Sequence, residues 1–177
     1  MELSSLLSSA LPSKVLTQDS SDYNTSNSTY FTAFNNAIKP AFIVQPTSSQ
    51  DVGSLMKALY PHLLKQKVSL AIRGTGHTPF AGAANVEGGV TIDLRGIKGV
   101  KLDKEKGEVE IGIGETWGNV YTELEKDGMT APGGRVARVG VGGLVLGGEF
   151  GLHSCTPTIL TAKRWPLPVL HPLRLCM

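Results

Sequence analysis

A chain of 177 residues is long enough for one domain with a real core, or for two small lobes. Hydrophobic residues make up 41% of the sequence and charged residues 18%, the balance of a globular protein in water. The net charge is +2 and no basic run occurs, so we expect no nucleic-acid partner. No apolar stretch approaches the roughly 20 residues that span a bilayer, so we expect no membrane segment.

The first 38 residues are rich in Ser, Asn and Thr, and we interpret residues 1–38 as a polar leader that packs its aromatic residues on a domain. The leader has neither a basic start nor a strong apolar segment, which favours a chain without a signal peptide and a cytoplasmic location. Secretion is the alternative, and only then would the glycosylation sequons at Asn24 and Asn27 matter. Cys155 and Cys176 are the only cysteines, so no disulfide framework supports the fold.

Residues 42–73 predict a strand, a helix and a second strand. Phe42–Pro46 reads as a buried strand stopped by proline, and residues 68–73 as another strand. Thr47 or Ser48 is a suitable N-cap for an amphipathic helix between them. This order is typical of a parallel α/β unit.

The next segment predicts further strands and a helix. Residues 89–94 form a third candidate strand, and residues 100–103 and 108–113 alternate apolar and polar positions as a hairpin does. Thr116 can cap a helix through Trp117 and Leu124 that Gly128 closes.

Glycine is unevenly distributed, because all 21 glycines lie between Gly53 and Gly151. Gly74-Thr75-Gly76 leaves the second strand, and its amides can form a nest for an anion such as a pyrophosphate. A plain tight turn is the alternative. Residues 140–148 are too rich in glycine for an ordinary helix or strand, although a glycine-rich helix with a close backbone approach is the alternative.

Four ordered motifs then resemble one family. Residues 72–83, 88–94, 116–121 and 139–148 resemble the flavin loop and the following motifs of the berberine bridge enzyme-like, vanillyl-alcohol-oxidase-type flavoproteins. The resemblance covers about residues 40–151 and is closest to the branch common in fungal secondary metabolism. It implies an α+β fold with the two-subdomain PCMH-type arrangement, which binds FAD between the subdomains and is incomplete here at its C-terminus.

The resemblance also implies residue roles. Residues 39–151 become the FAD-binding domain, with residues 152–177 as an atypical tail. His77 becomes the covalent anchor on the 8α-methyl carbon of FAD, since a neutral imidazole nitrogen is a nucleophile near pH 7. The expected cofactor-binding residues are Arg73, Gly74, Thr75, Gly76, His77, Thr78, Gly82, Val139, Gly140, Gly142, Gly143 and Gly147.

Three positions refine what the resemblance implies. Val136 stands where doubly linked members carry cysteine, so only the histidyl link is expected. Val139 stands where the family controls oxygen access to the flavin, and valine favours an oxidase. Glu149 replaces a usual glycine and adds a negative charge near a phosphate-bearing cofactor, which is expected to weaken affinity.

The tail after Gly151 contains no glycine or acidic residue, and its prolines led us to expect no helix or strand over residues 165–177. His153, Cys155 and His171 fit no zinc spacing, so we expect no metal. No catalytic residue is identified. The sequence therefore predicts an FAD-dependent oxidase acting on a small secondary-metabolite substrate, in a truncated form, with a non-catalytic flavin-binding fragment or degenerate paralogue as the alternative.

Overall fold

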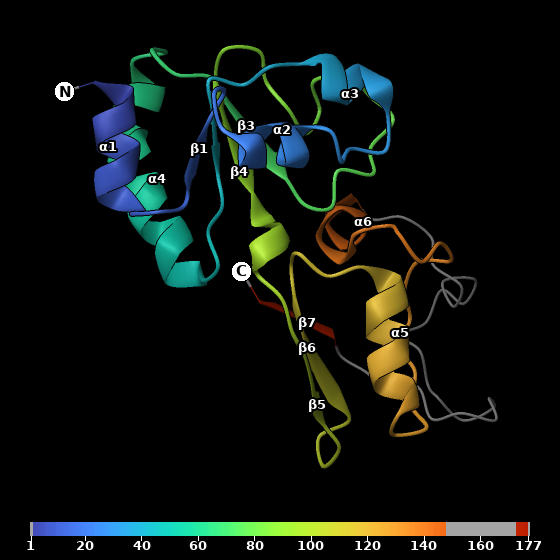
Figure 1. Cartoon of the computed structure of the whole chain (residues 1–177). Coiled ribbons are helices and arrows are strands. Elements are labelled where there is room, and N and C mark those ends of the chain that lie inside the picture. The colour runs from blue at the N-terminus through green and yellow to red at the C-terminus, as the bar shows by residue number, and fades with distance from the viewer. Residues whose placement is uncertain (1, 148–172, 177) are drawn as a thin grey trace. The chain divides into compact units, whose positions relative to one another are not determined.

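The computed structural model describes residues 2–147 and 173–176, which divide into two compact units (Figure 1). Unit 1 is Met1–Ile97 and unit 2 is Lys98–Met177. Both units mix helices and strands, as the α+β prediction requires. Each is described by itself.

Unit 1 is built on a four-stranded sheet in the order β1-β2-β4-β3. β2 (Phe42–Val44) and β3 (Leu70–Arg73) are each parallel to β4 (Val90–Asp93), which lies between them. All three were predicted as strands. β1 (Val15–Thr17) runs antiparallel along the outer side of β2 and was not predicted.

Helices flank this sheet. α1 (Leu3–Ala10) lies against α4 (Ser49–Leu64), and Leu55 and Leu59 of α4 are fully buried (Figure 1). Ser48 is the N-cap of α4, because its side chain accepts a hydrogen bond from the Asp51 amide. The short helices α2 (Ser21–Asn27), α3 (Ala33–Ala37) and the 3₁₀ helix η1 (Leu94–Gly96) complete the unit.

Residues 1–38, the predicted leader, pack on the parallel strands. They supply the edge strand β1 and belong to the same compact unit as those strands. Tyr23 and Tyr30 are buried as expected, whereas Phe31 and Phe34 are 63% and 71% exposed. Polar side chains also join the segment to the rest of the unit, because buried Ser26 donates to the Asp93 carboxylate and buried Asn27 accepts from Asn85.

Unit 2 contains the predicted hairpin and helix. β5 (Val100–Asp103) pairs antiparallel with β6 (Glu108–Gly112), with Val100 opposite Ile111. Thr116 caps α5 (Trp117–Glu125) by accepting from the Asn119 amide. Gly128 follows with φ +63°, a conformation that favours glycine at a helix C-terminus.

Two expectations for unit 2 were wrong. Val141–Gly147 forms the helix α6, and Gly142 explains why: a Cβ there would lie 2.5 Å from Ile113 Cγ1, so glycine permits a close approach. Leu173–Cys176 forms the strand β7, parallel to β6, although no regular structure was expected there. The prolines of the tail all precede this strand, so they do not interrupt it.

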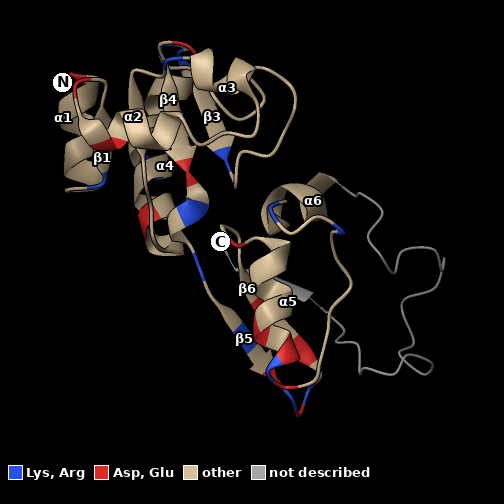
Figure 2. Ribbon diagram, turned by 45° about the vertical axis from the view of Figure 1, so that its right-hand side comes forward, with Lys and Arg blue, Asp and Glu red and all other residues tan. Residues whose placement is uncertain are grey.

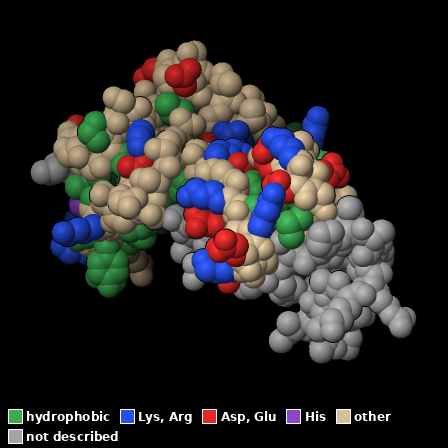
Figure 3. All heavy atoms as spheres, turned by 90° about the horizontal axis from the view of Figure 1, so that it is seen from below, with side chains coloured by type: hydrophobic (Ala, Val, Ile, Leu, Met, Phe, Trp, Pro, Cys, Tyr) green, Lys and Arg blue, Asp and Glu red, His purple; other side chains and the backbone are tan. Residues whose placement is uncertain are grey.

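Charge is evenly mixed over the described residues. Figure 2 shows acidic and basic residues interspersed along α5 and the β5–β6 hairpin, and on the face drawn in Figure 3 the two signs again lie next to each other. Among the described residues, no helix is long and apolar enough to cross a membrane.

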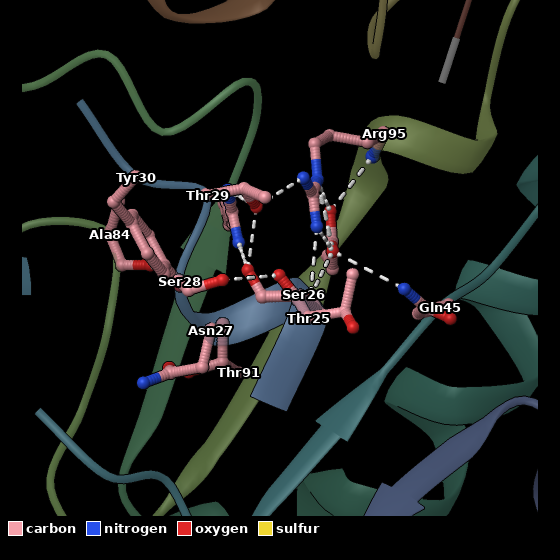
Figure 4. Close-up of polar contacts among 12 residues, drawn as sticks. Thr25, Ser26, Asn27, Ser28, Thr29, Tyr30, Gln45, Ala84, Thr91 and Arg95 are labelled. Carbon is pink, nitrogen blue, oxygen red and sulfur yellow. Dashed lines mark hydrogen bonds and ion pairs between the residues drawn. The ribbon is translucent and has the colours of Figure 1, made fainter. Parts of the chain in front are cut away.

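A buried polar cluster joins the end of β3 to the N-terminal segment (Figure 4). The Arg73 side chain is completely buried; its guanidinium donates to the Ser26 carbonyl and to Thr29 Oγ1, both at 2.8 Å. The same guanidinium lies 3.6 Å from the centre of the Tyr30 ring. Arg95 binds Asp93 through its Nε and Nη2 atoms, and the Asp93 carboxylate also accepts from Ser26 Oγ.

Burial and neighbouring charges shift the pKa values in this group of residues. The group, called the arginine cluster below, consists of Ser26, Thr29, Tyr30, Arg73, Asp93 and Arg95. Burial lowers the pKa of Arg73 and raises that of the Tyr30 hydroxyl to about 12. For Asp93, burial favours the protonated form, but hydrogen bonds and charge from Arg95, with the charge of Arg73, outweigh it and hold the Asp93 pKa below its usual value.

We expect Asp93→Asn to destabilise the protein by on the order of 3 kcal/mol at pH 7, because it leaves two arginines without their carboxylate. The folded-state pKa of Asp93 is lowered, so its stabilisation is present above the unfolded pKa and is lost as pH falls through the folded value. The difference in the free energy of unfolding between wild type and Asp93→Asn should therefore become smaller below about pH 4. Urea unfolding followed by circular dichroism measures both. Asp103→Asn, which removes an exposed ion pair with Lys106, is the control, and equal stability of Asp93→Asn and wild type at pH 7 would contradict the expectation.

Candidate functional site

The loop after β3 has the shape of a tight turn whose glycine is required. Gly76 has φ +78°, and a Cβ there would lie 2.8 Å from Tyr30 Cδ1 and 2.9 Å from Arg73 Nε. A side chain at Gly76 therefore fails both on backbone conformation and on space. Two residues of the arginine cluster, Tyr30 and Arg73, therefore pack directly against this loop at Gly76.

His77 follows Gly76 and lies at the surface of unit 1, with its ring half-buried. The ring stacks on Phe31, with centroids 4.2 Å apart and an interplanar angle of 25°. The Phe31 amide donates to the Gly76 carbonyl at 3.0 Å, so both the backbone and the ring of Phe31 contact the loop. No pattern in the sequence indicates that Phe31 and His77, 46 positions apart, lie in contact.

Asn35 holds the second half of the loop. Its side-chain amide donates to the carbonyls of Thr78 and Phe80, and its Oδ1 accepts from the Gly82 amide at 3.1 Å. Asn35 is fully buried, and Gly82 has φ +78°. Asn35 is a positioning residue that the sequence analysis missed; its only signal was the density of Asn between positions 24 and 36.

Unit 2 contributes the second predicted segment. The Trp117 amide donates to the Val139 carbonyl at 3.0 Å, and Gly140 bridges to Thr116. The Val139 side chain packs against the apolar cluster around Trp117, so core packing already accounts for an apolar residue there. Val136 is 54% exposed.

Five of the predicted cofactor glycines fall into two classes. Gly76 and Gly142 have no room for a Cβ because protein atoms lie against them. A Cβ built at Gly74, Gly143 or Gly147 meets no atom of the described residues within 4 Å, and none of the three has a positive φ. The fold thus explains the first class and leaves the second free to face a ligand.

Three further predicted residues have different surroundings. The Arg73 guanidinium binds the N-terminal segment, although its buried Nε has no hydrogen-bond partner within the described part of the chain. Thr75 and Thr78 are half-buried, and Thr78 Oγ1 accepts from the Phe80 amide. Glu149, His153, Cys155 and His171 lie outside the described residues. Within residues 2–147 and 173–176 no group of His, Cys, Asp or Glu could hold a metal ion.

Curated relatives resemble most of this chain. An FAD-dependent monooxygenase of Emericella nidulans is 36% identical over 148 residues, which are 84% of this chain and 30% of the relative. An FAD-dependent monooxygenase of Cochliobolus heterostrophus is 40% identical over 119 residues, 65% of this chain and 22% of the relative. The chain therefore spans less than a third of the length of these relatives.

Solved structures share the fold. Phl p 4, a grass pollen allergen with glucose dehydrogenase activity, superposes with a TM-score of 0.70 at 21% identity, covering 85% of this chain and 32% of that chain. BBE-like 1 of Physcomitrella patens, as wild type, gives a TM-score of 0.66 at 23% identity, over 79% of this chain and 29% of that one.

A family model described as an FAD binding domain matches residues 40–162, which are more than half of the chain. The fold and the relatives agree with that match. The chain belongs to the berberine bridge enzyme-like, vanillyl-alcohol-oxidase-type family of FAD-binding oxidoreductases.

Proposed function

We propose that this chain binds FAD through the backbone at Gly74 and along α6, and that His77 forms the only covalent link to it. The observation that carries the proposal is the open space at Gly74, Gly143 and Gly147. Glycine is a costly residue in a helix such as α6, at roughly 1 kcal/mol relative to Ala. Open space alone does not indicate a ligand, because Gly53 of α4 is equally open. Gly74, Gly143 and Gly147 differ in lying within the two segments that resemble the family's flavin motifs, and there close approach of the cofactor to the backbone is our proposed reason for glycine.

The residues fit an anionic cofactor held by amides. A loop that leaves a strand with Gly-x-Gly presents successive N–H groups to one point, which suits a pyrophosphate. The Nη atoms of Arg73 are already hydrogen-bonded to the N-terminal segment, so we propose that this side chain supports the loop and does not bind the pyrophosphate through them. Thr75, Thr78 and Gly140 remain proposed contacts at the ends of the two segments.

His77 suits the covalent link because its ring is only half-buried. His77 would supply the imidazole nitrogen that bonds to the flavin 8α-carbon, with one proton lost from each partner and the two electrons passed to dioxygen, which would leave as hydrogen peroxide. Val136 offers no nucleophile for a second link. Bound FAD supplies a two-electron acceptor, and we propose that it takes a hydride from a small secondary-metabolite substrate and passes the electrons to oxygen.

A second candidate is a flavin-binding fragment without turnover. It is favoured by the described residues, among which no base that could accept the substrate's proton is identified. The relatives' names, which include monooxygenases and a xylooligosaccharide oxidase, indicate that oxygen chemistry varies among them.

Gly74→Ala and Gly143→Ala should each fold normally and lose FAD affinity. We expect a loss of about tenfold or more, since forcing a methyl group into filled space costs roughly 1–3 kcal/mol. Titration of the apoprotein by flavin fluorescence measures this. Gly53→Ala in α4, which also meets nothing within 4 Å, is the matched control and should bind FAD as wild type does. Unchanged affinity in both loop variants would reject the proposed contacts.

His77→Ala should release all its flavin on acid precipitation, whereas wild type stays yellow. His62→Gln, which changes another unit 1 histidine, is the control and should retain the flavin. If His77→Ala still holds flavin after denaturation, the histidyl link lies elsewhere.

The second candidate predicts that FAD bound to this chain is not bleached by phenolic, alcohol or sugar substrates without oxygen, and that no peroxide forms with oxygen. Hydride transfer needs a positioned substrate and a group that accepts its proton, and positioning alone lowers a barrier by about 7–11 kcal/mol. Stopped-flow absorbance at the flavin band tests this. Substrate-dependent bleaching at enzymatic rates would instead establish the chain as an oxidase by itself.

A further inference from the structure

Phe31 has a position that the core does not explain. Its ring is 63% exposed, so burial in unit 1 gains little from it. Phe34, three residues later, is 71% exposed and stacks on no ring within the described part of the chain. Phe31 differs because its ring lies flat against His77 at 4.2 Å.

The backbone fixes Phe31 in that place. Its amide donates to the Gly76 carbonyl, and the preceding residue, Tyr30, is held by the arginine cluster and by a bond from its hydroxyl to the Ala84 carbonyl (Figure 4). On the other side, Thr32 caps α3 by accepting from the Asn35 amide. The backbone of Phe31 is therefore anchored by its own amide and through both neighbours, which places its side chain beside His77.

The stack restricts the imidazole. A ring lying nearly parallel to His77 at this distance blocks one face and limits rotation about the χ2 angle, because turning the imidazole would lose the contact. The edge of the imidazole, which carries the nitrogen lone pair, remains available. Bond formation at that nitrogen depends on orientation, since small displacements of a reacting atom lower a rate strongly.

We propose that Phe31 is a positioning residue, whose ring holds the His77 imidazole in the orientation needed for attachment to the flavin. This inference rests on the proposed covalent link. It assigns to the N-terminal segment a role in cofactor attachment, separate from the contacts that bind FAD.

The test separates binding from attachment. Apoprotein of the full chain is mixed with FAD; affinity is taken from early fluorescence quenching, and attachment from the growth of acid-stable flavin with time. Phe31→Ala should bind FAD as wild type does but attach it about 3- to 10-fold more slowly, the range that loss of one aromatic stack gives. Phe31→Tyr keeps the ring and should restore the rate. Phe34→Ala removes an equally exposed phenylalanine and should behave as wild type.

An independent readout comes from NMR of the apoprotein. The ring protons of His77, assigned with His77→Gln, should lose their ring-current shift in Phe31→Ala and keep it in Phe31→Tyr. His77 ring protons that keep their wild-type chemical shifts in Phe31→Ala would overturn the inference.

Each kinetic outcome has one meaning. Attachment by Phe31→Ala at the wild-type rate overturns the inference and leaves the covalent link standing. A parallel loss of affinity and attachment also overturns it, because Phe31 would then act in binding. Wild type that binds FAD without attaching it overturns the covalent link, and the positioning role with it.

Discussion

Unit 1 depends on a buried guanidinium. Arg73 ends β3 inside the protein, and removing its charge from water is costly unless the guanidinium finds hydrogen-bond acceptors or an aromatic ring in place of water. The partners come from the N-terminal segment: the Ser26 carbonyl, the Thr29 hydroxyl and the Tyr30 ring. Satisfying Arg73 thus fixes residues 26–30 on the sheet, and those residues in turn support the loop that follows β3.

The same segment is fastened by amide side chains. Asn85 donates to Asn27 Oδ1 and to the carbonyls of Asn35 and Ile38, while its own Oδ1 accepts from Thr91 Oγ1 on β4. Hydrogen bonds are directional, whereas apolar contacts are not, so this network specifies how the segment is oriented as well as that it is buried. On the proposed function, this network would hold the loop amides in a fixed orientation for the pyrophosphate.

Sequence patterns predicted the elements whose signals are local. The strands β2 to β6 and the caps Ser48 and Thr116 follow from alternation and capping chemistry within a few residues. β1 was missed because residues 15–17 lie in a polar context, and only pairing with β2 makes them a strand. α6 was misjudged because glycine content speaks against a helix unless tertiary packing, here against Ile113, requires glycine.

The sequence motif of the site could be predicted, whereas the contacts that hold it in place could not. The flavin loop could be named from consecutive residues 73–82. Phe31 and Asn35, which contact that loop, are more than 40 positions away, and no periodicity in one sequence joins them to it. The division of the glycines was equally hidden, because a Cβ clash depends on what lies opposite in space.

That division has a consequence for how such a chain would diverge. If the cofactor were abandoned, Gly76 and Gly142 would still be retained, because replacing them damages the fold itself. Gly74, Gly143 and Gly147 would be released, and random replacement by alanine there would even favour the folded state in α6. On the proposed contacts, these three positions would therefore be the first to change if flavin binding were lost. All three hold glycine in this sequence, as the proposed flavin contacts require.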